Sequence, residues 1–201
     1  MRITQKQYAQ LIEKTLKKKQ LQSAALVNDG ADFTKPTVVL GIDPSLRCTG
    51  FGVIVADRRS TKVLDFGRIP CPNNWKKSQC LINIFQTLDR VIQKHKPEVC
   101  VIEGLFYAQN IKTALVMGEA RGACIAAAAK AGIKIAEIAP RKVKQALVGY
   151  GAAQKLAVAK MVQRILGLAV RPESDAADAL ALAITFVNEN FKRTLKNCNF
   201  I

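Results

Sequence analysis

Short apolar runs alternate with helical periodicities along most of the chain. Continuous apolar runs bounded by polar turns predict five strands, at 37–43, 50–56, 62–69, 99–103 and 133–138. Short turns join the first three strands, which favours an antiparallel meander. Five helices are predicted from apolar residues at helical spacing, at 81–92, 110–131, from Pro140 onward, at 154–166 and at 175–190. This order predicts an α/β domain.

The same patterns divide the chain into three parts. Residues 1–36 predict a basic helical arm followed by a linker rich in Asn, Asp and Gly, and the main domain follows at 37–190. A basic tail is expected at 191–201. Whether the arm contacts DNA, a partner or a second copy, or is a solvated extension, stays open. Ser174 is expected to cap the last helix of the main domain.

Net charge points to the class of partner. The chain has 31 Lys and Arg against 15 Asp and Glu, a formal charge of +16, while 49% hydrophobic residues allow a buried core. The arm carries seven basic and three acidic residues, so +12 remains on residues 37–201. Such an excess favours a polyanion, most often nucleic acid. A basicity that serves only solubility is the alternative.

Several other classes are disfavoured by the composition. The longest apolar run is Ala123–Ala129, far below the roughly 20 residues of a spanning helix, and the first residues do not resemble a secretory signal. We therefore expect a cytoplasmic protein with no membrane contact. Six cysteines without a Cys-x-x-Cys pair, and a single histidine at His95, argue against a zinc site.

Four acidic residues stand where they interrupt apolar segments. Asp43 ends the first predicted strand and Glu103 the fourth, and Asp175 and Asp178 are three residues apart on one face of the last helix. Such groups can converge, and four ionised carboxylates at one point require a cation between them. Oxygen ligands suit Mg²⁺ or Mn²⁺. Two such ions roughly 4 Å apart can drive hydrolysis of a phosphodiester.

Each acid also has a purely structural alternative. Asp43 precedes Pro44 and is a suitable turn residue, Asp175 suits a helix N-terminus, and Asp178 is compatible with an exposed helix surface. Glu103 fits such a role less well, since a lone carboxylate after the buried run 99–102 would be costly.

Five blocks of sequence, in order, resemble the signature blocks of the RuvC family of Holliday junction resolvases. They are Gly41-Ile-Asp-Pro-Ser-Leu-Arg-Cys-Thr-Gly-Phe-Gly52, Ile102-Glu-Gly-Leu-Phe-Tyr-Ala-Gln-Asn110, Gly118-Glu-Ala-Arg-Gly122, Val143-Lys-Gln-Ala-Leu-Val-Gly-Tyr-Gly151 and Asp175-Ala-Ala-Asp-Ala-Leu-Ala181. The resemblance runs from about residue 38 to residue 185. It implies a ribonuclease H-like fold, a mixed five-stranded sheet flanked by helices.

The resemblance also implies an activity. It predicts a homodimeric, structure-specific DNA endonuclease that acts in recombination and repair, and that resolves four-way junctions by paired symmetric nicks through metal-dependent hydrolysis. Mg²⁺ is the expected cofactor, with Mn²⁺ able to substitute and two ions per active site, and the RuvA-RuvB branch-migration complex is an implied partner. A junction-binding protein without cleavage activity is the alternative. Actin-like ATPases share a Gly-Ile-Asp turn but need a second similar half, which this sequence lacks.

Site residues follow from the matching positions. The resemblance makes Asp43, Glu103, Asp175 and Asp178 catalytic metal ligands, and it assigns Lys144 and Lys155 to catalysis and to contact with the scissile phosphate. Phe106 matches an aromatic residue that stacks on unpaired bases, with a core aromatic as the alternative. Arg121 is a DNA-binding candidate that equally fits a structural role.

The loop of the first block departs from the family pattern, and one face of the third block is ambiguous. Ser45 and Leu46 follow Pro44 where the family usually has Gly after Pro, so the loop after Asp43 is expected to differ. Gly118 and Gly122 lie four residues apart and suit either a dimer contact or ordinary helix packing.

Overall fold

The computed structural model describes residues 35–104 and 111–197, with side chains up to residue 190. The chain divides into two units, residues 1–30 and residues 31–201, and the described residues belong to the second. The arm predicted at 1–36 thus lies outside the described residues except for its last two positions.

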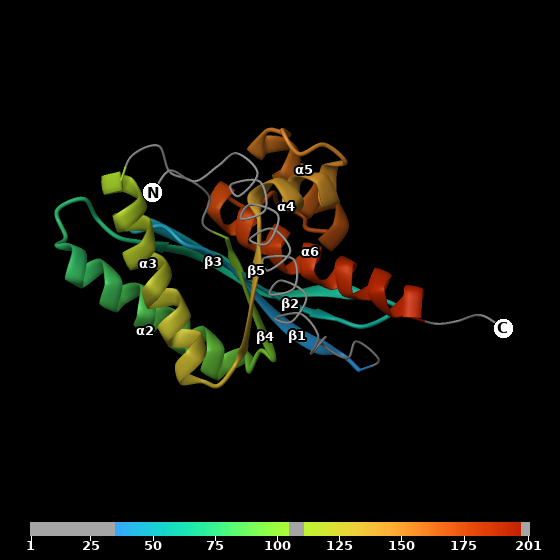
Figure 1. The fold of residues 1–201 in the computed structure, drawn as a ribbon, viewed down its shortest axis with the longest axis horizontal. Coiled ribbons are helices and arrows are strands. Elements are labelled where there is room, and N and C mark those ends of the chain that lie inside the picture. Colours follow the sequence, from blue (N-terminus) through green and yellow to red (C-terminus); the bar gives the residue numbers. More distant parts are fainter. Residues whose placement is uncertain (1–34, 105–110, 198–201) are drawn as a thin grey trace, which may run out of the picture. The chain divides into compact units, whose positions relative to one another are not determined.

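Five strands form one sheet in the order β3-β2-β1-β4-β5 (Figure 1). Their bounds are Thr37–Asp43 for β1, Cys48–Ala56 for β2, Thr61–Pro70 for β3, Val99–Glu103 for β4 and Lys134–Ile138 for β5. β2 pairs antiparallel with β1 and β3, whereas β4 pairs parallel with β1 and β5. The predicted mixed five-stranded sheet, with its antiparallel meander, is confirmed.

Helices cover both faces of this sheet. α2 (Lys77–His95) and α3 (Ile111–Lys130) cover one face, and α4 (Pro140–Val148), α5 (Lys155–Leu166) and α6 (Ser174–Asn197) cover the other (Figure 1). Among residues 35–104 and 111–197, none of these helices has both the length and the apolar content to cross a membrane.

The alternation of side chains along β1 builds the two cores. Leu40 and Ile42 are fully buried among residues of α2 and α3, while Val39 is fully buried among residues of α4, α5 and α6. Successive residues of a strand point to opposite faces, so one apolar run supplies both layers. Burial of both sets therefore fixes toward which face of the sheet each side chain of β1 points.

Glycines let α6 lie directly against the backbone of β1 and β2. A Cβ added at Gly41 would stand 2.0 Å from the carbonyl oxygen of Ala179, and one added at Gly50 would stand 2.0 Å from that of Asp175. A Cβ at Gly52 would stand 2.6 Å from the Leu180 side chain. Only glycine permits this approach, which places the first three turns of α6 over β1 and β2.

The ends of α6 differ from the prediction. The carbonyl of Glu173 accepts a hydrogen bond of 2.8 Å from the backbone N–H of Ala177, so the cap position falls at Glu173 and Ser174 is already helical. The helix continues to Asn197 because no Gly or Pro interrupts the sequence after residue 190. The tail predicted at 191–201 therefore begins inside α6.

Replacing Gly41 by Ala should destabilise the domain, because the added methyl group collides with the α6 backbone rather than with a mobile side chain. We expect a loss of about 1–3 kcal/mol or more in the free energy of unfolding, measured by urea denaturation. Gly151→Ala is the control, since its nearest neighbour, the Arg141 carbonyl oxygen, is 3.5 Å away. Equal stability of the two variants would contradict the close contact at Gly41.

Candidate active site

Asp43 and Glu103 stand side by side at the ends of two parallel strands. β1 and β4 pair in register up to Ile42 and Ile102, and each acid is the next residue of its strand. Since side chains alternate along a strand, both acids lie on the face opposite to the fully buried isoleucines that precede them. That is the face covered by α6.

The first turns of α6 bring the other two acids to the same place. Gly50 pairs with Asp43 across β1 and β2, and the carbonyl of Asp175 lies against Gly50. Asp175 therefore stands next to the end of β1, and Asp178 follows it by three residues on the same helix face. Two strand ends and one helix start thus meet at one point, which we call the acidic centre (Asp43, Glu103, Asp175 and Asp178).

The pKa values show that the four carboxylates act on one another. Burial, followed by the charges of Glu103 and Asp178 and, more weakly, Asp175, raises the pKa of Asp43 from 3.8 to about 7. Burial, followed by the charge of Asp178, raises the pKa of Glu103. A cation at the acidic centre would reverse these shifts, because it stabilises the ionised carboxylates.

Two lysines face the acidic centre from α4 and α5. Lys155, the first residue of α5, places its ammonium nitrogen 2.8 Å from a carboxylate oxygen of Asp178, and this hydrogen bond raises the pKa of Lys155. The charges of Lys155 and, more weakly, Lys144 on α4 offset part of the rise in the pKa of Glu103. The structure thus brings both predicted lysines together with the predicted acids.

The carboxylates nevertheless do not form a ready-made metal cage. In the described part of the chain, no three His, Cys, Asp or Glu side chains are arranged to hold an ion. The donor set itself fits Mg²⁺ or Mn²⁺, since it consists only of carboxylate oxygens whose mutual repulsion a divalent ion would relieve. Binding an ion would require side-chain movement, including release of Asp178 by Lys155.

Arg121 has a structural position beneath the site. Its side chain is only 8% exposed, and its guanidinium donates hydrogen bonds to the backbone carbonyl of Glu103 and to the carboxylate of Glu137 on β5. Arg121 thereby ties the end of β4 to the neighbouring strand. These contacts give Arg121 a structural role, and its assignment to DNA binding stays a prediction. Phe106 lies outside the described residues.

One charged neighbour of the site was missed from the sequence. Arg68 on β3 forms an ion pair with Glu173, and both Arg68 and Asp175 hydrogen-bond to the thiol of Cys48. Burial, followed by the hydrogen bond to Asp175, raises the pKa of Cys48 to about 11. The signal available was Arg68 interrupting the apolar alternation of β3 near its end.

Comparisons with known proteins agree with this arrangement. The family model described as crossover junction endodeoxyribonuclease RuvC matches residues 39–186. The crossover junction endodeoxyribonuclease RuvC of Akkermansia muciniphila is 45% identical over 147 residues, which cover 73% of this chain and 88% of that relative.

Solved structures give the same result. The structure of Thermus thermophilus RuvC in complex with a Holliday junction substrate matches with a TM-score of 0.71 and 33% identity, covering 79% of this chain and 96% of that chain. The yeast mitochondrial Holliday junction resolvase matches with a TM-score of 0.58 and 13% identity over 88% of this chain and 90% of that chain, which shows a shared fold.

The mixed sheet, the helices on its two faces and the acidic centre define a nuclease with a ribonuclease H-like fold. The match covers most of the chain and most of each relative. The chain belongs to the RuvC family of crossover junction endodeoxyribonucleases.

The raised pKa of Asp43 predicts a pH dependence of stability in metal-free buffer. Between about pH 4 and pH 7 the folded state keeps a proton that the unfolded state has released, so stability falls as pH rises. Asp43→Asn should remove this part of the fall. At pH 7.5 we expect its melting temperature in EDTA to exceed that of the parent by at least about 2 °C.

Thermal unfolding followed by circular dichroism from pH 4 to pH 8 measures this difference. Asp57→Asn is the matched control, because Asp57 lies in the turn between β2 and β3, away from the acidic centre. If the melting temperatures of the Asp43→Asn variant and the parent changed with pH in parallel, Asp43 would not be the source of the pH dependence.

Proposed function

We propose that this chain binds four-way DNA junctions as a homodimer and cuts two strands symmetrically, with two Mg²⁺ or Mn²⁺ ions held by Asp43, Glu103, Asp175 and Asp178. The observation that carries the proposal is the meeting of these four carboxylates at the start of α6, where burial and mutual repulsion raise the pKa values of Asp43 and Glu103. The junction bound to the Thermus thermophilus relative supports the substrate.

The chemistry follows from the donor set. Divalent ions bound by carboxylates supply Lewis-acid activation of water and stabilise the leaving oxygen of a phosphodiester. The carboxylates of the chain position that chemistry at the ends of β1 and β4. Arg121 contributes indirectly, since its hydrogen bond to the Glu103 carbonyl holds the end of β4.

Lys155 and Lys144 would hold the scissile phosphate. Lys155 is bonded to Asp178, and its side chain is 65% exposed, so its ammonium is accessible to DNA at the edge of the acidic centre. When a cation takes its place at Asp178, the ammonium becomes available to a phosphate oxygen. Two lysines beside four acids thus attract the substrate without neutralising the ligands.

Other parts of the proposal rest on the family resemblance. It supports Phe106 as the residue that stacks on unpaired bases at the junction centre, and the RuvA-RuvB complex as a partner. A chromosomal DNA substrate in turn supports a cytoplasmic location.

α3 offers a surface for the second copy. Ile111 and Leu115 are 77% and 63% exposed, and a Cβ added at Gly118 or Gly122 would meet nothing within 4 Å among the described residues. These four residues recur at i, i+4, i+7 and i+11, so they form one stripe along the helix. The open space beside both glycines supports the dimer contact over packing within the chain.

Asp43→Asn should abolish cleavage while leaving junction binding intact or tighter. Loss of a ligand removes several kcal/mol of catalytic stabilisation, so we expect at least a 100-fold lower rate on a synthetic four-way junction with Mg²⁺ or Mn²⁺. Binding is measured in EDTA by gel shift, and Asp57→Asn should cleave like the parent. Loss of binding by Asp43→Asn would make this acid structural, and failure of the parent to cut in either metal would refute the proposal.

Leu115→Glu should convert the dimer to monomers, because it places a charge in the apolar stripe of α3. Sedimentation velocity at micromolar concentration measures this change. Leu64→Glu is the matched control, since Leu64 is 45% exposed on β3 and lies outside the stripe. A dimer that survives Leu115→Glu but dissociates with Leu64→Glu would place the interface elsewhere.

A further inference from the structure

Arg68 lies beside the acidic centre on the side of β3. In the sheet, Arg68 pairs with Gly50 and Gly50 with Asp43, so these residues form one row across three strands. β3 lies beyond β2, on the side of β1 away from β4 and Glu103. Neighbouring strands are about 4.8 Å apart, which puts the backbone of Arg68 about 10 Å from that of Asp43.

Contacts bring the side chain of Arg68 closer to the centre than its backbone. The Cys48 thiol hydrogen-bonds to both Asp175 and Arg68, so the guanidinium lies one side chain away from a proposed metal ligand. The carbonyl of Asp175 fills the space above Gly50, so Arg68 approaches the centre at the start of α6 rather than directly at Asp43. Arg68 therefore adds a positive charge beside Asp175, as Lys155 does beside Asp178.

The second partner of Arg68 is the carboxylate of Glu173, directly before α6. The side chains of this ion pair are 42% and 63% exposed. Exposed ion pairs contribute little to stability, because water solvates both charges almost as well. Such a pair can exchange its carboxylate for a phosphate group, which guanidinium binds with similar geometry.

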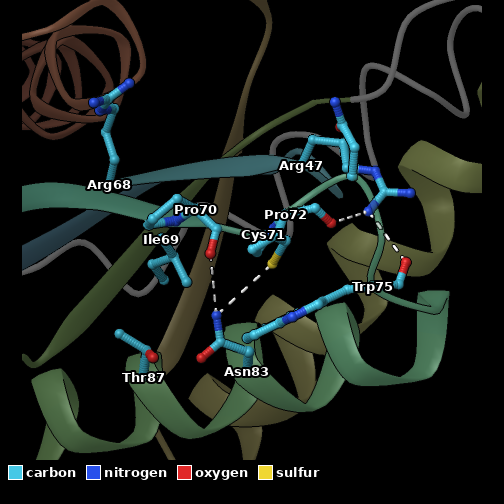
Figure 2. Close-up of a pocket in the computed structure, with 10 residues that line it drawn as sticks. Arg47, Arg68, Ile69, Pro70, Cys71, Pro72, Trp75, Asn83 and Thr87 are labelled. Atoms are coloured by element: carbon cyan, nitrogen blue, oxygen red, sulfur yellow. Dashed lines mark hydrogen bonds between the residues drawn. The ribbon is translucent and has the colours of Figure 1, made fainter.

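Another arginine of the same region shows a different arrangement. Arg47 borders a pocket of about 630 Å³ and donates hydrogen bonds to the carbonyls of Pro72 and Trp75, at 2.7 and 3.3 Å. Figure 2 shows this fixed position, and it shows Arg68 pointing away from Asn83 at the bottom of the pocket. Arg47 holds a loop, whereas Arg68 is directed toward the side of the sheet that carries the acidic centre.

We propose that Arg68 binds a backbone phosphate of the DNA strand that crosses the acidic centre, and that Glu173 holds the guanidinium until the phosphate replaces it. The inference rests on the proposed function, because the strand must enter the acidic centre for Arg68 to meet it. The guanidinium lies one side chain away from Asp175, so the phosphate that it contacts is a near neighbour of the scissile phosphate.

Four-way junction binding in EDTA, as a function of salt concentration, tests this contact. Arg68→Ala should weaken binding on the order of ten-fold and lower the slope of log K against log salt by about 1. Arg68→Lys should retain most of the slope. Arg59→Ala is the control of equal charge, since exposed Arg59 lies in the turn at the other end of β2 and β3.

Glu173→Gln separates a DNA contact from a structural ion pair. If Arg68 binds phosphate, removing its competitor should tighten binding several-fold, and this gain should disappear when Arg68→Ala is added. If the pair only fastens the start of α6, Arg68→Ala and Glu173→Gln should lower the melting temperature alike and leave the salt slope unchanged, which overturns the inference.

Cleavage by the parent chain distinguishes failure of the proposed role of Arg68 from failure of the proposed function. A parent that cuts junctions in Mg²⁺ or Mn²⁺, combined with an Arg68→Ala variant whose affinity and salt slope match those of Arg59→Ala, would refute the role of Arg68 alone. A parent that neither binds nor cuts junctions would refute both.

Discussion

The site depends on the direct contact between the backbone of α6 and the glycines of β1 and β2. Gly41 and Gly50 leave no room for a side chain, so the carbonyls of Ala179 and Asp175 lie against the sheet. This contact fixes how far α6 stands from β1 and how its first turn is oriented. Without it, the acids of the helix would not reach the acids of the strands.

That contact creates an electrostatic problem that the rest of the site resolves. Four carboxylates are brought together partly out of water, and the pKa of Asp43 rises to about 7 as a result. Lys155 and Lys144 offset part of the repulsion, and a divalent cation would offset more. The chain has a net charge of +16 and contains this negative centre. The net positive charge attracts a polyanion, and metal ions held at the centre could then act on it.

The pattern of apolar residues was sufficient to predict the sheet and the order of the helices. Buried runs such as 37–43 and 99–103 have sharp ends, and each ends in the acid that later proved to face α6. The i, i+3 spacing of Asp175 and Asp178 likewise indicated one helix face. These signals are local, so a single sequence contains them.

Contacts between distant segments were harder to predict. The buried position of Arg121 depends on the Glu103 carbonyl and on Glu137, and the pairing of Arg68 with Glu173 joins residues more than 100 positions apart. The α6 helix also extends past residue 190, because the sequence shows no breaker there and the apolar pattern alone did not define its end. Such features follow from packing in three dimensions rather than from local preference.

Binding of Mn²⁺ to the full chain tests the central claim most directly, because it asks whether the acidic centre holds cations without requiring DNA or catalysis. Isothermal titration calorimetry should detect two ions per chain in the parent protein. Asp178→Asn should lose at least one of them, since it removes a ligand oxygen that Lys155 would otherwise release. A parent that binds no Mn²⁺ at millimolar concentration, or an Asp178→Asn variant that binds as many ions as the parent with the same affinity, would show that the acidic centre is not the metal site.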